Sequence, residues 1–192
     1  DIIFITDEGN SKSEYEKLKE LGFQVFVSNP RHYNGIKKTM LDMGKIFKME
    51  ARAEEIIKNW DQKIAEIKNK HDQIILNYVM FMISTKPIIS VGKRSFINQI
   101  LTYAGMKNIS ADSDVSYPML SREDVILRNP DYILLYKTNK NDVNDLLDLY
   151  PEWNTLSAVV NNRVLYINAD LYSRPGPRFV EAVEDLFTRI YK

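Results

Sequence analysis

The chain has 192 residues, of which 44% are hydrophobic and 27% are charged, so it is long enough for one compact domain or two small ones. Its 26 Lys and Arg residues balance its 26 Asp and Glu residues, which argues against a broad cationic surface and against nucleic acid as a partner. The absence of cysteine excludes disulfides and thiolate metal sites.

The first predicted elements are a strand, a helix and a second strand. The strands cover Ile2 to Ile5 and Phe23 to Val27, and the helix is capped by Ser13 and closed by Gly22. A right-handed crossover makes the two strands parallel. Two parallel strands and one helix cannot cover both faces of a sheet, so we expect a first lobe that is incomplete in this chain.

Apolar residues then recur at helical spacing from Asn34 to about His71. Gly44 and the segment from Lys45 to Lys48 interrupt this pattern and leave a long helix from Glu50 to Lys70. That helix would span roughly 30 Å at 1.5 Å per residue. We expect it to pack on its own domain, with a coiled-coil partner as the alternative.

The remaining two thirds of the chain alternate strands with helices, which predicts a second, complete α/β lobe. The predicted strands cover Ile74 to Ile83, Lys86 to Gly92, Asp131 to Tyr136 and Arg163 to Ile167. The predicted helices begin after Ser95, after Ser121, at Asn141, at Leu156 and near Pro177. The longest apolar run, Ile74 to Ile83, is too short to span a bilayer.

A polar stretch between the last strand and the last helix is the main candidate site. Asp170, Tyr172 and Arg174 lie there, confined by Pro175 and Pro177. Helix N-termini and the carboxyl ends of strands in open α/β sheets are common places for polar ligands. The alternative is that Asp170 and Arg174 only pair with each other at the surface.

Metal and catalytic motifs are weak throughout. The two histidines, His32 and His71, lie on different predicted elements without a carboxylate cluster at ligand spacing, so no metal site and no cofactor is predicted. A glycine-rich phosphate loop and a nucleophile elbow are both missing from the sequence. The sequence therefore favours a binding protein over an enzyme.

Four stretches in order resemble the substrate-binding proteins of ABC importers for iron siderophores, haem and vitamin B12. They are Tyr117 to Asp124, Asn129 to Leu135, Trp153 to Val164 and Asp170 to Arg178. The resemblance implies two α/β lobes with mostly parallel sheets, joined by one long helix and binding the ligand in the cleft between them. Residues 1–33 would be the remnant of the first lobe, 34–72 the helical segment with the connecting helix, and 73–192 the second lobe.

The same resemblance implies roles for individual residues. Tyr117 stands where vitamin B12 binders place a tryptophan against the ligand, and Asp170 and Arg174 stand where those binders place an acid and an arginine. Arg174, with Arg178 as a second donor, would meet the anionic oxygens of a chelate, and Tyr172 and Tyr117 would stack on it. The alternative for Tyr117 is a loop aromatic that covers the sheet edge.

Glu123 aligns with an acid that docks to the permease in this family, although it could be a plain acid in a first helical turn. The resemblance thus implies an extracytoplasmic solute-binding subunit that captures an iron chelate, siderophore or haem, and delivers it to an ABC permease. Cobalamin is the alternative ligand. The protein would touch the membrane only through a lipid anchor that is absent from this chain. From other classes, a metal-chelatase-like enzyme and an oligomerising fragment remain as alternatives.

Overall fold

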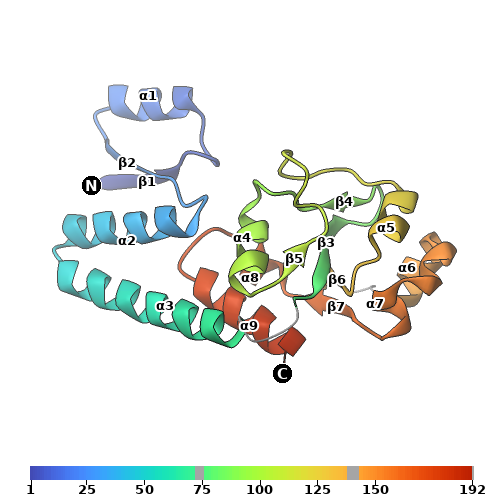
Figure 1. Ribbon diagram of the computed structural model, residues 1–192. Helices are drawn as coiled ribbons and strands as arrows, with labels where there is room; N and C mark the ends of the chain where they lie inside the picture. Colours follow the sequence, from blue (N-terminus) through green and yellow to red (C-terminus); the bar gives the residue numbers. More distant parts are fainter. Residues whose placement is uncertain (72–75, 138–142, 192) are drawn as a thin grey trace. The chain divides into compact units, whose positions relative to one another are not determined.

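The computed structural model describes residues 1–71, 76–137 and 143–191, and it divides into two compact units (Figure 1). The smaller unit contains residues 1–61 and 175–177, and the larger unit contains residues 62–174 and the chain from Arg178 onward. The division falls inside one long helix, α3 (Glu50–His71), so the predicted long helix from Glu50 is confirmed.

The smaller unit begins with two parallel strands joined by a helix, as predicted. These elements are β1 (Ile2–Thr6), α1 (Lys12–Glu20) and β2 (Gln24–Ser28). The cap of α1 is Ser11 and not Ser13. The Ser11 hydroxyl accepts from the Glu14 amide at 3.2 Å, and the Glu14 carboxylate accepts from the Ser11 amide at 2.6 Å. This reciprocal capping box starts the helix two residues earlier than predicted.

A helical hairpin follows, formed by α3 and α2 (Tyr33–Phe47). Lys48 ends α2 in the left-handed conformation, with φ of 57°. The two helices approach closely at Gly44, where an added Cβ atom would lie only 2.8 Å from the Cβ of Ala53. The Tyr33 hydroxyl donates to Asp61 at 3.0 Å across the hairpin. The interruption predicted around Gly44 to Lys48 is therefore the turn between two packed helices.

The larger unit is built on a five-stranded sheet. Its strands are β3 (Tyr78–Ser84), β4 (Ile89–Ser90), β5 (Lys107–Asn108), β6 (Tyr132–Tyr136) and β7 (Val164–Ile167). The order is β4-β3-β6-β7, with β5 also paired to β3, and every pair is parallel except β3 with β4. A mixed α/β fold with mostly parallel sheets was predicted and is confirmed. The first residues of the predicted strand, 74 and 75, lie outside the described residues.

Helices cover both faces of this sheet, as a parallel sheet requires. Figure 1 shows one group on each side of the strands. The first group is α4 (Phe96–Tyr103), α8 (Ala169–Tyr172) and α9 (Phe179–Tyr191). The second group is α5 (Arg122–Arg128), α6 (Val143–Leu149), the short 3-10 helix η1 (Pro151–Thr155) and α7 (Ser157–Val160).

Each face has its own packed core. Phe96 of α4 and Phe179 of α9 lie with ring centroids 5.6 Å apart on one face. On the other face Trp153, fully buried, stacks on Tyr150 at 4.4 Å. None of the helices in the described ranges is long and apolar enough to cross a membrane.

Candidate functional site

An irregular segment, residues 115–120, borders the larger sheet beside β4 and brings Tyr117 to the surface. Its backbone pairs antiparallel with residues 88–92: Pro118 accepts from the Ser90 amide at 3.0 Å, and Ser116 accepts from the Gly92 amide at 2.8 Å. The exposed fraction is 61% for Val115, 50% for Tyr117 and 70% for Met119, whereas the two residues between them, Ser116 and Pro118, are partly buried. We name these three exposed side chains the apolar ledge.

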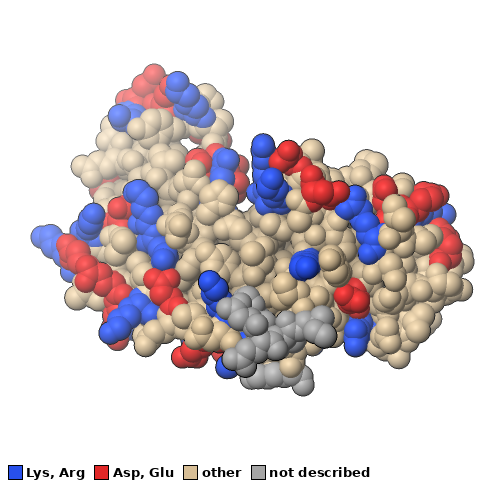
Figure 2. Space-filling view, in the orientation of Figure 1, with Lys and Arg blue, Asp and Glu red and all other residues tan. Residues whose placement is uncertain are grey.

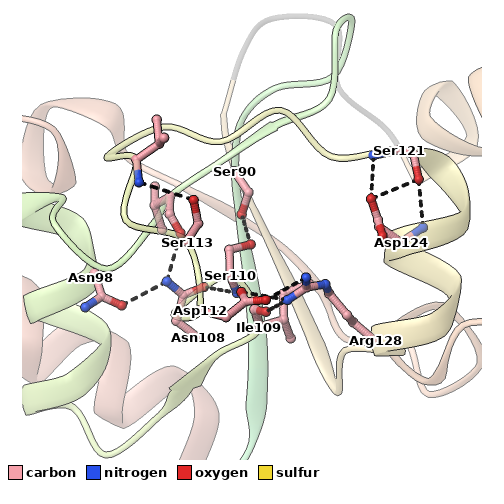
Figure 3. Close-up of polar contacts among 12 residues, drawn as sticks. Ser90, Asn98, Asn108, Ile109, Ser110, Asp112, Ser113, Ser121, Asp124 and Arg128 are labelled. Atoms are coloured by element: carbon pink, nitrogen blue, oxygen red, sulfur yellow. Dashed lines mark hydrogen bonds and ion pairs between the residues drawn. The ribbon is translucent and has the colours of Figure 1, made fainter.

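A polar network anchors the loop before the ledge (Figure 3). The Asn108 side-chain amide donates to the Val91 carbonyl and to the Asn98 side chain, both at 2.8 Å, and its oxygen accepts from the Ser110 amide at 3.0 Å. The hydroxyls of Ser110 and Ser90 lie 3.1 Å apart. Because these groups are buried and satisfied, the start of the loop is held to the sheet.

Asp112, two residues further along the loop, is tied to α5. Both Arg128 guanidinium nitrogens donate to Asp112 at 2.8 Å, and this hydrogen bonding holds the pKa of the Asp112 carboxyl below its ordinary value. Ser121 and Asp124 form a capping box at the start of α5, which confirms the helix predicted to begin after Ser121 (Figure 3). The loop that presents Tyr117 is therefore held before Tyr117 by these side chains, and around Tyr117 by backbone hydrogen bonds to residues 88–92.

Tyr136, the last residue of β6, links the ledge to the polar stretch after β7. Burial raises the pKa of its phenol to about 12; the neighbouring Tyr117 adds to the rise, and a side-chain hydrogen bond with Ser173 opposes it. Tyr136 thus stays a neutral phenol at physiological pH. Ser173 directly precedes Arg174, so Tyr136 and the polar stretch lie together at the carboxyl ends of the parallel strands β6 and β7.

Sequence reasoning missed Tyr136. It was predicted as part of a buried strand, and its position as the final strand residue was the feature that could have marked it.

The polar stretch itself is more ordered than predicted, because α8 occupies its first half and Asn168 caps that helix. Arg174 pairs with Asp170 at 3.0 Å, and both side chains are largely exposed. The Arg178 guanidinium donates to the Asp170 carbonyl at 2.9 Å. The structure therefore contains the Asp170–Arg174 surface pair that the sequence analysis gave as the alternative. The Arg174 guanidinium has further N–H donors that it can offer to a ligand.

Tyr172 lies in the core and not on the surface. Its side chain is fully buried, and its hydroxyl donates at 2.6 Å to Asp185, which also accepts from Arg189 at 2.7 Å. Burial and the Asp185 carboxylate raise the pKa of Tyr172. Burial alone would raise the pKa of Asp185, but the hydrogen bonds from Arg189 and Tyr172 outweigh it and lower that pKa. Tyr172, predicted to stack on a ligand, presents no exposed ring face for stacking.

Glu123 is exposed in the first turn of α5. The adjacent Arg122 lies over the Tyr150 ring, 4.8 Å from its centroid, and pairs with Glu152 at 3.5 Å. This contact fixes the start of α5 against the core on that face. Glu123 therefore extends from a well-anchored helix end, and its docking role stays a prediction.

Charges of both signs are interspersed over the face shown in Figure 2, and neither forms a broad continuous area there. Next to the ledge, Asp114 lies 3.7 Å from Lys93 and 3.8 Å from Arg94. Across the described ranges, His, Asp and Glu residues form no group of three or more that could hold a metal ion. The surface around the ledge is therefore apolar at its centre and ionic at one rim.

The smaller unit has a hollow of about 260 Å³ between α1 and its strands, which no sequence argument predicted. Three apolar or aromatic side chains line it, Ile5, Tyr15 and Val27, together with the polar residues Thr6, Asp7, Asn10, Ser11 and Lys12. Arg31 pairs with Asp7 at 3.3 Å and with Glu8 at 3.0 Å. This hollow forms because α1 buries none of its residues against the strands.

Comparison with known proteins gives one consistent family. A family model described as periplasmic binding protein matches residues 1–171. The vitamin B12-binding protein of Vibrio parahaemolyticus is 25% identical over 184 residues, which are 95% of this chain and 66% of the relative. A Bacillus subtilis protein, the uncharacterized ABC transporter substrate-binding lipoprotein YvrC, is 27% identical over 94% of this chain and 58% of its own length.

The fold also matches a solved structure. A possible iron-binding, periplasmic solute-binding protein from Staphylococcus epidermidis superimposes with a TM-score of 0.85 at 27% identity, over 100% of this chain and 76% of that protein. The chain spans about two thirds or less of the length of the two sequence relatives named above.

Proposed function

This chain belongs to the periplasmic binding protein family, and from that premise we propose that it is the solute-binding part of an ABC importer for a metal chelate. The preferred ligand is an iron chelate, either a siderophore or haem. One observation supports this most: Tyr117 is an exposed aromatic side chain on a segment that is hydrogen-bonded to the edge of the sheet beside β4, and it neighbours Tyr136 at the carboxyl end of the parallel strand β6. Ligands of open α/β folds bind at such edges.

The residues around Tyr117 would each make a different kind of contact with the ligand. The Tyr117 ring offers a face for stacking, and the partly buried phenol of Tyr136 stays protonated beside it. Arg174 offers charge-assisted hydrogen bonds to anionic oxygens, with Asp170 holding its guanidinium in place. Binding and release need no bond to be made or broken, so we assign no catalysis.

Cobalamin is the second candidate ligand. The vitamin B12-binding name of the Vibrio relative favours it, and so does the aromatic surface, since a corrin ring also presents a broad apolar face.

Delivery of the ligand would use α5. Glu123 is an exposed carboxylate that an arginine of the permease could pair with at the membrane surface. We place the protein outside the cytoplasmic membrane, as the family description and the lipoprotein name of the Bacillus relative suggest.

Ligand titration of the complete natural protein tests this proposal. Haem, cyanocobalamin and a ferric hydroxamate would be titrated while intrinsic fluorescence is followed, and we expect saturable quenching by one of them. Tyr117→Ala and Arg174→Ala should each weaken the affinity for that ligand about tenfold or more, which corresponds to a loss of roughly 1.4 kcal/mol of binding free energy. Tyr78→Ala and Arg52→Ala are matched controls, because both replace exposed side chains remote from the ledge in sequence. Failure of all three ligands to bind would refute the proposal.

A further inference from the structure

The chain between β5 and α5 is held by the helix that it leads into. Asn108 ends β5, residues 109–120 follow, and α5 begins at Arg122 after its cap, Ser121. From the last turn of the same helix, the Arg128 side chain reaches back to the start of this connection (Figure 3). Residues 109–128 therefore form a closed ring, which we name the α5 ring, in which one side chain joins the end to the beginning.

Arg128 makes three hydrogen bonds where the α5 ring closes. Its guanidinium donates to both carboxylate oxygens of Asp112 at 2.8 Å and also to the Ile109 carbonyl. A two-pronged contact between arginine and a carboxylate fixes orientation as well as distance, because the planar guanidinium matches the two carboxylate oxygens. One side chain therefore joins the last turn of α5 to two residues of the connection.

The partner of Arg128 is not the one that helix geometry favours. Asp124 lies one turn earlier on α5, and oppositely charged residues four positions apart on a helix commonly pair. Asp124 instead accepts from the Ser121 amide at 3.3 Å and from the Ser121 hydroxyl at 3.0 Å. The capping box thus engages the nearer carboxylate, and Arg128 pairs across the connection with Asp112.

Tyr117 lies inside the α5 ring, on a segment whose own backbone partner is a short edge strand. That partner, β4, is two residues long, and its pairing with β3 contains a register shift. Short, irregular edge strands open at low free energy. The Asp112–Arg128 pair provides a second attachment five residues before Tyr117, to a helix anchored by the fully buried Val125.

We propose that Arg128, acting through Asp112, is a positioning residue that sets the place of Tyr117 for ligand binding without contacting the ligand. The inference rests on the proposed function, since it requires that Tyr117 contacts a ligand. An exposed ion pair adds little to the free energy of unfolding, so this pair should matter more for affinity than for stability. An aromatic ring that is already in place loses less conformational entropy on binding.

The test is a double-mutant cycle between Arg128 and Tyr117 in the complete natural protein. Arg128→Ala, Tyr117→Ala and the double variant would be titrated with haem, cyanocobalamin and a ferric hydroxamate while intrinsic fluorescence is followed. Asp112→Ala removes the same ion pair from its other side. Lys63→Ala is the matched control, because Lys63 pairs with Glu184 at 2.9 Å on helices that carry none of the proposed ligand contacts. Thermal unfolding checks that each variant remains folded.

For the probe that binds, we expect Arg128→Ala and Asp112→Ala each to weaken affinity about three- to tenfold, with Lys63→Ala within about twofold of wild type. In the Tyr117→Ala background, Arg128→Ala should change affinity by less than about twofold, because the side chain that it positions is gone. The midpoint of thermal unfolding should fall by at most about 4 °C in Arg128→Ala and in Asp112→Ala.

Hydrogen exchange tests the same inference without a ligand. The amides of residues 113–120 should exchange about threefold faster or more in Arg128→Ala, and at the wild-type rate in Lys63→Ala. Three results would each overturn the inference and leave the proposed function standing: unchanged exchange, unchanged affinity in Arg128→Ala, or an affinity loss that persists in full in the Tyr117→Ala background. Binding of none of the three probes would overturn both.

Discussion

The strands β1 and β3 look alike in sequence and differ in burial. Both are rich in apolar residues, as buried parallel strands are. Yet Phe4 in the middle of β1 is 39% exposed, whereas Phe81 in the middle of β3 is fully buried. An apolar run thus predicts a strand but does not establish that helices and neighbouring strands cover it.

The difference follows from what surrounds each strand. β3 has β4 and β5 on one edge, β6 on the other, and helices on both faces. In the smaller unit β1 pairs only with β2 among the described residues, and the buried side chains lie between α2 and α3 instead. The larger unit should therefore respond strongly to core substitutions, and the strands of the smaller unit weakly.

Trp153→Ala should have the largest effect. Trp153 is fully buried and stacks on Tyr150, and truncation of such an aromatic residue costs about 3–5 kcal/mol of the free energy of unfolding. Urea denaturation followed by circular dichroism measures this loss. A cost under about 1 kcal/mol would show that the core between the sheet and η1 is not tightly packed.

Tyr172→Phe should have the next largest effect. It removes a hydrogen bond to the charged Asp185, which is worth about 1.5–3 kcal/mol. Because the folded pKa of Asp185 is lowered, its contribution is present above the ordinary pKa of 3.8 and is lost as pH falls through the folded value. Unfolding measured from pH 7 to pH 2 should therefore show a shallower acid loss in Tyr172→Phe. An unchanged acid limb would mean that Arg189 supplies the whole shift.

Ligand affinity is the control measurement for the Tyr172→Phe variant. If Tyr172 is a core residue, the Phe variant should bind ligand as wild type does at neutral pH, since no ring face is exposed.

The sequence predicts the features that depend on neighbouring residues in the chain, and it does not predict those that depend on contacts between distant segments. Helix bounds such as Glu50, the cap at Ser121 and the parallel pairing of β1 with β2 follow from residue spacing and from chain topology. The burial of Tyr172 does not follow, because the short helix α8 turns that side chain inward toward α9. The exposure of Val115 and Met119 depends on pairing with residues 88–92, which no local pattern reveals.

Gly92→Ala should have a moderate effect on stability and a clear one on binding. The added methyl group would meet the Val115 carbonyl, and overpacking of this kind costs typically about 1–3 kcal/mol. The segment that carries Val115 must shift to relieve the clash, so affinity should fall with stability. Gly22→Ala is the comparison, because that glycine has a φ of 84° but nothing within 4 Å of its Cβ position. Loss of stability in both variants with loss of affinity only in Gly92→Ala would tie the ledge to binding.

Phe4→Ala should have the smallest effect, and it tests the comparison most directly. Phe4 stacks on Phe47 with ring centroids 5.7 Å apart and lies 5.5 Å from Phe26, so it has aromatic neighbours although it is partly exposed. Those contacts are worth about 0.5–1.5 kcal/mol each beyond area burial, but an exposed ring gains only part of the burial energy. We expect a cost below half of that for Phe81→Ala, measured by the same urea titration. Equal costs would mean that β1 is as well covered in solution as β3, and burial would then no longer distinguish the two strands.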